Sequence, residues 1–165
     1  MNSKKIYLAS PLGFTSEGET YRTRIRVQLM EVGFVVLDPW ESGAQFEQET
    51  KDIFAVDSTL ARQAALNKLA LKIGRSNIAM IDQADHVLAV LDGTEPDSGT
   101  VSELGYAVGR GKRVYGLRTD VRESGDFPGM PINLQVLTFI ITSGGCLFRR
   151  IQDMTRNQFN GENIG

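Results

Sequence analysis

The sequence of 165 residues predicts an α/β fold, a parallel β-sheet of about five strands with helices on both faces. Short apolar runs alternate with segments whose apolar residues recur at helical spacing. The run from His86 to Leu91 is almost continuously apolar, as expected of a strand covered on both faces. Connections of crossover length imply right-handed crossovers, and ligands of such sheets bind beyond the carboxyl ends of the strands.

Four apolar runs are the predicted strands. The first follows two lysines and stops at Ser10-Pro11. The second stops at Asp38-Pro39, because proline cannot donate a hydrogen bond to a sheet ladder. The four runs are residues 5–9, 34–37, 86–91 and 114–117.

Helical spacing marks the segments between these runs. Apolar residues from 19 to 32 predict an amphipathic helix that stops at Gly33. Ser58 is expected to cap a helix that runs to about Ile73 and stops at Gly74. We expect a shorter helical turn next, and a loop or lid before Ser58. These two segments are residues 77–84 and 39–57.

The C-terminal part predicts two helices joined by a glycine turn. The first is the segment INLQVLTFI after Pro131, and the second is CLFRRIQDM after the turn SGG. The last residues, 157–165, are expected to be frayed. The length of the chain favours one domain over residues 1–165.

Composition excludes several classes of function. The formal net charge is −2 with scattered basic residues, which disfavours nucleic-acid polymers and acidic membranes as partners. No segment predicts a signal peptide or a membrane span, and the single cysteine, Cys146, cannot form an internal disulfide, so we expect a cytoplasmic protein. His86 is the only histidine, and glycine-rich phosphate loops are absent, so no metal or cofactor is expected.

The segment EPDSGTVSELGYA, residues 95–107, follows the third predicted strand and has two interpretations. Thr100 and Glu103 match a capping box, which would give both residues a purely structural role. Alternatively, Glu103 lies in the first turn of a helix at the ligand-binding edge of the sheet, where the helix N-terminus favours an ionised carboxylate. The spacing alone leaves both open.

A carboxylate held beside a sugar is the nucleophile of retaining glycosyl transfer. Glu103 is the candidate nucleophile, and Asp97 is the candidate group that assists proton transfer to the departing base. A turn through Ser98 and Gly99 would fold Asp97 back over the start of the helix and place these residues at the substrate.

The chain resembles the nucleoside 2-deoxyribosyltransferases over nearly its whole length. The resemblance rests on IYLASPLGF, ADHVLAVLDG, EPDSGTVSELGYA and MPINL, of which the third is the specific part. It implies a flavodoxin-like fold, a covalent deoxyribosyl-glutamate intermediate at Glu103, and exchange of one nucleobase for another. It also implies that Tyr7 orients Glu103, and that Asn133 contacts the sugar of a neighbouring subunit in a homo-oligomer.

The remaining candidates concern the nucleobase and the sugar. Pro11 and Phe14 are expected to form an apolar platform for the base, although Phe14 in the core is an equal alternative. Asp92 either binds the substrate or belongs to an ordinary Asp-Gly turn. Asn77 stands where some family members carry an aspartate; its amide can bind a base edge but cannot donate a carboxylic proton. Trp40 is expected to anchor the long loop.

Two other functions compete with base exchange between deoxyribonucleosides and free nucleobases. One is hydrolysis of 2'-deoxynucleoside 5'-monophosphates, for which the loop SPLGF supplies few phosphate donors. The other is a non-catalytic nucleotide-sensing module that uses the same crevice for binding alone.

Overall fold

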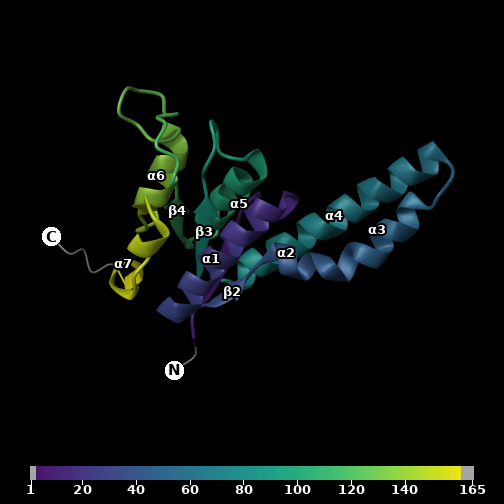
Figure 1. Cartoon of the computed structure of the whole chain (residues 1–165), viewed down its shortest axis with the longest axis horizontal. Helices are drawn as coiled ribbons and strands as arrows, with labels where there is room; N and C mark the ends of the chain where they lie inside the picture. The colour runs from purple at the N-terminus through teal and green to yellow at the C-terminus, as the bar shows by residue number, and fades with distance from the viewer. Residues whose placement is uncertain (1–2, 161–165) are drawn as a thin grey trace.

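The computed structural model describes residues 3–160 and contains one parallel five-stranded sheet in the order β2-β1-β3-β4-β5 (Figure 1). This order has a switch point between β1 and β3, as in flavodoxin-like folds. The predicted α/β fold is confirmed. The strands are β1 (Lys5–Ala9), β2 (Val35–Leu37), β3 (His86–Val90), β4 (Arg113–Leu117) and β5 (Leu147–Phe148).

The helices that surround the sheet follow in chain order. The α-helices are α1 (Ser16–Val32), α2 (Pro39–Ser42), α3 (Glu47–Phe54), α4 (Thr59–Gln83), α5 (Ser98–Gly109), α6 (Leu134–Thr142) and α7 (Arg156–Asn160). Three short 3-10 helices are η1 (Leu12–Phe14), η2 (Gly43–Phe46) and η3 (Ile151–Asp153). In the described part of the chain, none of these helices is both long and apolar enough to cross a bilayer.

Each face of the sheet has its own apolar core, because side chains alternate along a strand. On β1, Ile6 and Leu8 pack with residues of α1 and of the C-terminal segment, including Phe159. Tyr7 and Ala9 point to the other face, where α4, α5 and α6 supply the packing partners. The tyrosine ring therefore faces the helix that carries Glu103.

The segment predicted as a loop or lid, residues 39–57, is largely helical. Pro39 ends the strand as expected, but it also occupies the first turn of α2, where its missing N–H costs nothing. The carboxylate of Asp38 caps this helix by accepting from the N–H of Trp40. The polar segment 47–54 forms helix α3, which packs on α4 through Ile53.

The predicted stop at Gly74 is wrong, because α4 runs without a break from Thr59 to Gln83 and includes the predicted turn at 77–84. The Ser58 cap is confirmed. A glycine inside a helix costs only about 1 kcal/mol, which neighbouring turns can offset.

The prediction of a second C-terminal helix over CLFRRIQDM is also wrong. The chain forms the two-residue strand β5 and the 3-10 helix η3 instead, and the ring of Phe148 on β5 stacks on the ring of Tyr115 on β4. Residues 157–160, predicted as frayed, lie in α7, with Phe159 buried against Tyr115. The rest of that prediction, residues 161–165, lies outside the described residues.

Candidate active site

Tyr7 and Glu103 meet at the carboxyl edge of the sheet. The side chain of Tyr7 is completely buried, and its hydroxyl donates to Oε1 of Glu103 over 2.8 Å. Glu103 is half-buried on the face of α5 that covers β1 and β3. Because the tyrosine ring is fixed by the core, it fixes the position of the carboxylate.

Asn77 makes a second bond to the same oxygen. Its side-chain amide, on α4, donates to Oε1 of Glu103 over 3.1 Å. Both donors therefore end on Oε1, and neither bonds Oε2. Two hydrogen bonds on one oxygen orient the carboxylate and leave the other oxygen as the one available to react.

The environment of Glu103 acts on its pKa in opposite directions. Burial raises the pKa, the bonds from Tyr7 and Asn77 lower it, and the charge of Asp97 raises it, with a net increase. Burial and the nearby Glu103 also raise the pKa of Tyr7 far above its ordinary value of 10.0. Tyr7 is therefore a neutral hydrogen-bond donor at any physiological pH.

The capping-box interpretation of Thr100 and Glu103 is wrong. Helix α5 begins at Ser98, and its cap is Asp97, whose Oδ2 accepts from the N–H of Thr100 at 2.8 Å and from its hydroxyl at 3.0 Å. Glu103 is thus the sixth residue of the helix, beyond the first turn where the helix dipole acts most strongly.

Asp97 folds back over the start of α5, as the turn at Ser98 and Gly99 predicted. The position of a Cβ on Gly99 would lie 3.1 Å from Oδ2 of Asp97, so a side chain there would crowd the carboxylate. Asp97 is exposed, and its charge reaches Glu103. The side chain of Asp97 therefore caps α5 and also raises the pKa of Glu103.

The loop after β1 brings two aromatic rings together. Phe14 is 78% exposed and meets Trp40 edge to face, with the ring centroids 4.7 Å apart. The indole of Trp40 covers Gly13, where an added Cβ would come within 2.0 Å of the ring, and its N–H donates to the carbonyl of Ser10. Phe14 therefore lies outside the core, and Pro11 is half-buried beside it.

Asp92 joins the ends of β3 and β4. Its Oδ1 accepts from the N–H groups of Thr119 and Asp120, and its Oδ2 accepts from the hydroxyl of Tyr21. Each carboxylate oxygen of Asp92 therefore accepts a hydrogen bond from within the protein. The arrangement matches the turn interpretation of this residue more closely than contact with a substrate.

Asn133 lies at the N-terminus of α6. Its Oδ1 caps the helix by accepting from the N–H groups of Gln135 and Val136, and its Nδ2 donates to Asp126. It borders a cavity of about 570 Å³ that also includes Ser98 and Ser102 on α5.

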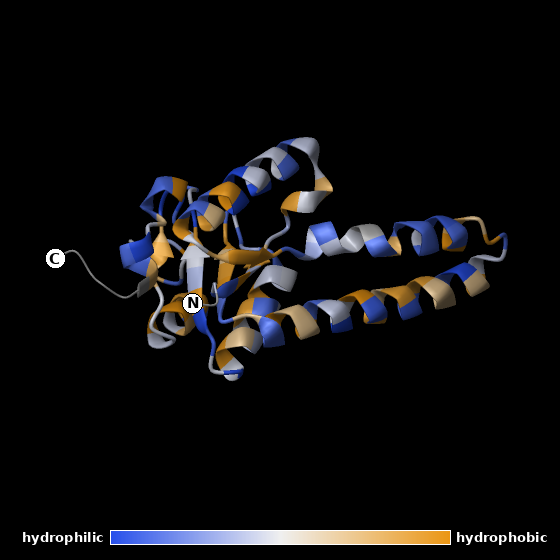
Figure 2. Ribbon diagram, turned by 90° about the horizontal axis from the view of Figure 1, so that it is seen from below, coloured by the Kyte–Doolittle hydropathy of each residue, from blue (hydrophilic) through white to orange (hydrophobic). Residues whose placement is uncertain are grey.

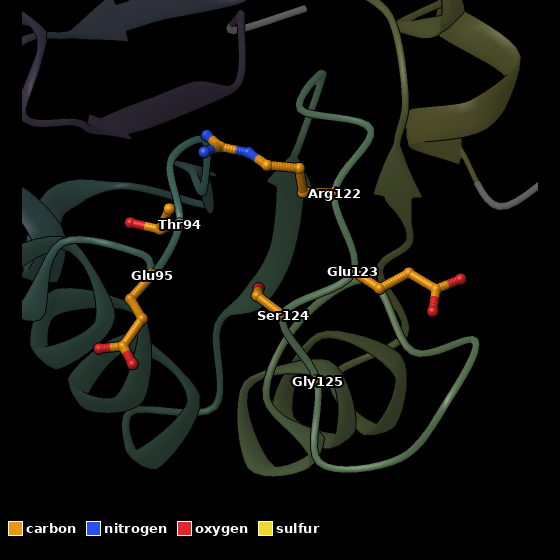
Figure 3. Close-up of a pocket in the computed structure, with 6 residues that line it drawn as sticks. All are labelled: Thr94, Glu95, Arg122, Glu123, Ser124 and Gly125. Carbon is orange, nitrogen blue, oxygen red and sulfur yellow. The ribbon is translucent and has the colours of Figure 1, made fainter.

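A second cavity, of about 520 Å³, adjoins the first (Figure 3). Arg122 extends toward the loop that carries Thr94, whereas the carboxylates of Glu95 and Glu123 point away from one another (Figure 3). Neither Tyr7 nor Glu103 lines either cavity. Ser98 and Asn133, two of the predicted substrate contacts, do line the cavity of about 570 Å³.

Buried arginines at this edge of the sheet were missed by the sequence analysis. Arg22 on α1 pairs with the buried Asp38 at 3.2 Å, next to the cap of α2. Arg118 is completely buried and donates to the carbonyls of Leu91 and Arg122, which ties the loop after β4 to the end of β3. Arginine is usually exposed, and nothing in the sequence marks these two as different.

No group of three or more potential metal ligands among histidine, cysteine, aspartate and glutamate is present in residues 3–160. The donors around Glu103 are a phenol and an amide, which suit hydrogen bonding to a carboxylate. The chemistry that this site supports is that of an oriented, partly desolvated carboxylate.

Comparisons with known proteins bear on the fold and the family of this chain. A search of curated proteins found no match. A conserved protein from Enterococcus faecalis V583 is similar in structure, with a TM-score of 0.70 and 21% identity over 98% of this chain and 100% of that one. A 2-deoxyribosyltransferase from the psychrotolerant bacterium Bacillus psychrosaccharolyticus has a TM-score of 0.64 and 22% identity over 98% of this chain and 92% of that one.

These two structures support the fold. The family model described as nucleoside 2-deoxyribosyltransferase matches residues 6–135, which include Tyr7, Asn77, Asp97, Glu103 and Asn133. This match covers most of the chain. The chain therefore belongs to the nucleoside 2-deoxyribosyltransferase family.

Proposed function

We propose that this protein exchanges the nucleobase of 2'-deoxyribonucleosides through a covalent deoxyribosyl-glutamate intermediate at Glu103. The observation that carries the proposal is the pair of bonds from Tyr7 and Asn77 to Oε1, which leaves Oε2 as the nucleophilic oxygen. The proposal treats residues 1–165 as a single domain.

In the first step, Oε2 of ionised Glu103 attacks the anomeric carbon of the sugar. A carbon–oxygen bond forms, the bond from carbon to the nucleobase breaks, and the base leaves with the electron pair and takes up a proton. Asp97 assists this proton transfer. In the second step, a nitrogen of another base attacks the same carbon, the ester bond breaks, Glu103 is released as a carboxylate, and the attacking nitrogen gives up its proton with the assistance of Asp97, which restores the proton used in the first step.

Retaining transfer needs a carboxylate that is ionised and held in place. Burial raises the pKa of Glu103, and the two bonds to Oε1 lower it. Tyr7 and Asn77 thus support both the charge and the orientation of the nucleophile.

The proposed substrate contacts come from the segments that follow β1 and β3. Phe14 and Pro11, in the loop after β1, are proposed to contact the base, and Ser98 and Gly99, at the start of α5, the sugar. The proposal includes a homo-oligomer in which Asn133 contacts the sugar bound to a neighbouring subunit. It requires no cofactor.

The test of this function mixes the protein with deoxyinosine and adenine and follows the products by chromatography. Deoxyadenosine and hypoxanthine are expected. Free deoxyribose without deoxyadenosine would assign the protein as a hydrolase, and binding without turnover would assign it as a sensing module. A hydrolase of 5'-monophosphates would release deoxyribose 5-phosphate from deoxyinosine 5'-monophosphate in a parallel reaction.

The covalent step has its own test. A slow fluorinated deoxynucleoside analogue should add its sugar to the peptide that contains Glu103, as detected by mass spectrometry. Glu103→Ala should form no adduct and no exchanged nucleoside. Efficient exchange by Glu103→Ala, or an adduct on another residue, would reject Glu103 as the nucleophile.

A further inference from the structure

The turn after β2 carries a buried ion pair that the proposed reaction does not use. The side chain of Asp38 is completely buried, and its Oδ1 accepts from Nη1 of Arg22 on α1 over 3.2 Å. Arg26, one turn further along α1, places its Nε 3.5 Å from Oδ2 of Asp38 and also pairs with Glu41 on α2. Buried charges are costly to take out of water, and such a pair often adds no net stability. Its presence therefore points to a geometric role.

Asp38 fixes the position of Trp40. The same Oδ1 accepts from the backbone N–H of Trp40 over 3.0 Å and so caps α2. At the other end of this residue, the indole N–H donates to the carbonyl of Ser10, just after β1, over 2.9 Å. Trp40 is therefore held through its backbone by the ion pair and through its ring by the end of β1.

The ring of Trp40 in turn supports the loop after β1. An added Cβ on Gly13 would lie 2.0 Å from this ring, so the indole lies directly against the backbone of the loop. Phe14 meets the same ring edge to face, with the centroids 4.7 Å apart. Because Phe14 is 78% exposed, most of its ring is open to a flat ligand while Trp40 supports it from one side.

The helix that begins at this tryptophan lies beside the candidate active site. After Trp40 the chain passes through α2 and η2 into α3, which extends with α4 away from the sheet (Figures 1 and 2). The hydroxyl of Ser42, at the end of α2, donates to Sδ of Met80 on α4 over 3.5 Å. Met80 lies one turn from Asn77 on α4 and packs against the core that contains Tyr7. Helix α2 therefore lies beside the part of α4 that contacts the candidate nucleophile.

The charge of Asp38 reaches the candidate active site as well. Burial and Glu103, and to a smaller extent the charge of Asp38, raise the pKa of Tyr7. Burial also raises the pKa of Asp38 itself, whereas the charges of Arg22 and Arg26 lower it. The two arginines therefore support the ionised form of a carboxylate that lies close to the phenol.

We propose that Asp38, through its ion pair with Arg22, is a positioning residue for the nucleobase. The pair fixes Trp40, and Trp40 fixes the ring of Phe14 on which the base stacks. This inference rests on the proposed function, which takes Phe14 as a contact of the base. Because Asp38 acts through Trp40 and not on the reacting carboxylate, its loss should weaken binding of the base more than it slows the transfer step. The expected signature is a raised KM for the free base with kcat little changed.

Fluorescence of Trp40 tests this role without turnover, because Trp40 is the only tryptophan of the sequence. Titration with adenine should change the emission of the wild-type protein, since a base stacked on Phe14 lies next to the indole. In Asp38→Asn the amide oxygen can still cap α2 but cannot form an ion pair with Arg22. The dissociation constant for adenine should rise about tenfold, the size of one base–aromatic contact. The emission maximum of the free variant should move to longer wavelength as the indole meets more water.

Two further variants separate positioning from stability. Arg22→Lys retains a positive charge beside Asp38 without the planar guanidinium, so it should fold and raise the dissociation constant for adenine by about threefold. Asp82→Asn is the matched control, because Asp82 pairs with Arg110 and joins α4 to the end of α5, on the face of the sheet opposite α1. Any effect of Asp82→Asn on the thermal midpoint should come without a change in the emission maximum or in the affinity for adenine.

An Asp38→Asn protein with the emission and the adenine affinity of the wild type would overturn the proposal. So would equal losses of affinity in Asp38→Asn and Asp82→Asn, which would indicate general destabilisation. In the exchange of deoxyinosine with adenine, a fall in kcat at unchanged KM would also overturn it, because Asp38 would then act on the transfer step. Should Asp38→Asn fail to fold, Arg22→Lys decides, and wild-type affinity in that variant would overturn the proposal.

Failure of the proposed function would look different. A wild-type protein whose emission responds to adenine but which forms no deoxyadenosine would reject base exchange and leave the positioning role supported. A wild-type protein that exchanges bases without a response of Trp40 to adenine would reject the positioning role and leave base exchange supported.

Discussion

The hydroxyl of Tyr7 donates to Oε1 of Glu103 over 2.8 Å from a side chain that is entirely buried. The bond links the core of the sheet to the candidate nucleophile. Because the phenol cannot move without disturbing β1, the carboxylate has one preferred orientation. The following predictions concern this bond and the groups around it.

Tyr7→Phe should reduce base exchange by about ten- to a hundredfold, since a hydrogen bond to a charged group contributes roughly 1.5–3 kcal/mol. The bond also lowers the pKa of Glu103, so its loss should move the acidic limb of the pH–rate profile to higher pH. Tyr115→Phe is the control, because Tyr115 bonds the carbonyl of Phe159 on the other face of the sheet. An unchanged acidic limb in Tyr7→Phe would contradict the assigned contact.

Asn77→Asp should raise the pKa of Glu103 further, because a second carboxylate beside Oε1 opposes ionisation of the first. We expect the acidic limb of kcat/KM to move to higher pH than in the wild type. Asn77→Ala should shift the limb in the same direction by a smaller amount, since it only removes a bond that favours the ionised form. Equal profiles in all three proteins would mean that α4 does not contact Glu103 in solution.

Asp97→Asn and Asp97→Ala should separate the two roles of this residue. Asparagine retains a capping oxygen, whereas alanine should lower the free energy of unfolding by about 1 kcal/mol, measured in urea. If Asp97 assists proton transfer, Asp97→Asn should slow exchange most for poor leaving bases. An equal decrease for all bases would leave Asp97 as a cap alone.

Glu103→Gln should change the pH dependence of stability. The folded pKa of Glu103 lies above its ordinary value of 4.5, so the native state binds this proton more tightly than the unfolded state does. The free energy of unfolding of the wild type should therefore fall as pH rises from about 4.5 through the raised pKa. The advantage of Glu103→Gln over the wild type should grow through this range and then level off.

Glu17→Gln provides the control for that measurement, because the pKa of the exposed Glu17 is lowered by its own backbone N–H and by Ser16. Its contribution has the opposite sign, with stability gained as pH rises toward 4.5 and retained above it. Parallel curves for Glu103→Gln and the wild type would show that Glu103 is not desolvated.

Four of the five strands could be predicted from the sequence because buried strands appear as short apolar runs. The two-residue strand β5 lies in a segment that was predicted as a helix. The alternation of Tyr7 with Ile6 and Leu8 likewise follows from strand geometry. Helix ends were less predictable. Gly74 and Pro39 have strong local preferences, but α4 continues through the first and α2 begins at the second.

Asp97 and Glu103 could be predicted as candidate site residues because both lie in one sequence motif, EPDSGTVSELGYA. The contact of Asn77 with Glu103 was not, since it joins residues 26 apart on two helices whose relative position depends on tertiary packing. The cap was assigned to Thr100 because a capping box is a local pattern, and Asp97 competes for the same N–H. Arg22 and Arg118 were missed because burial of a charge depends on distant partners.

The lengths of the outer strands bear on how this molecule avoids unwanted assembly. β2 has three residues and β5 has two, so neither edge offers a long row of free backbone groups to a foreign strand. Growth of the sheet by strand addition, the route to fibres, is thereby discouraged at both sides. Helix surfaces are therefore left as the favoured place for copies of this chain to meet.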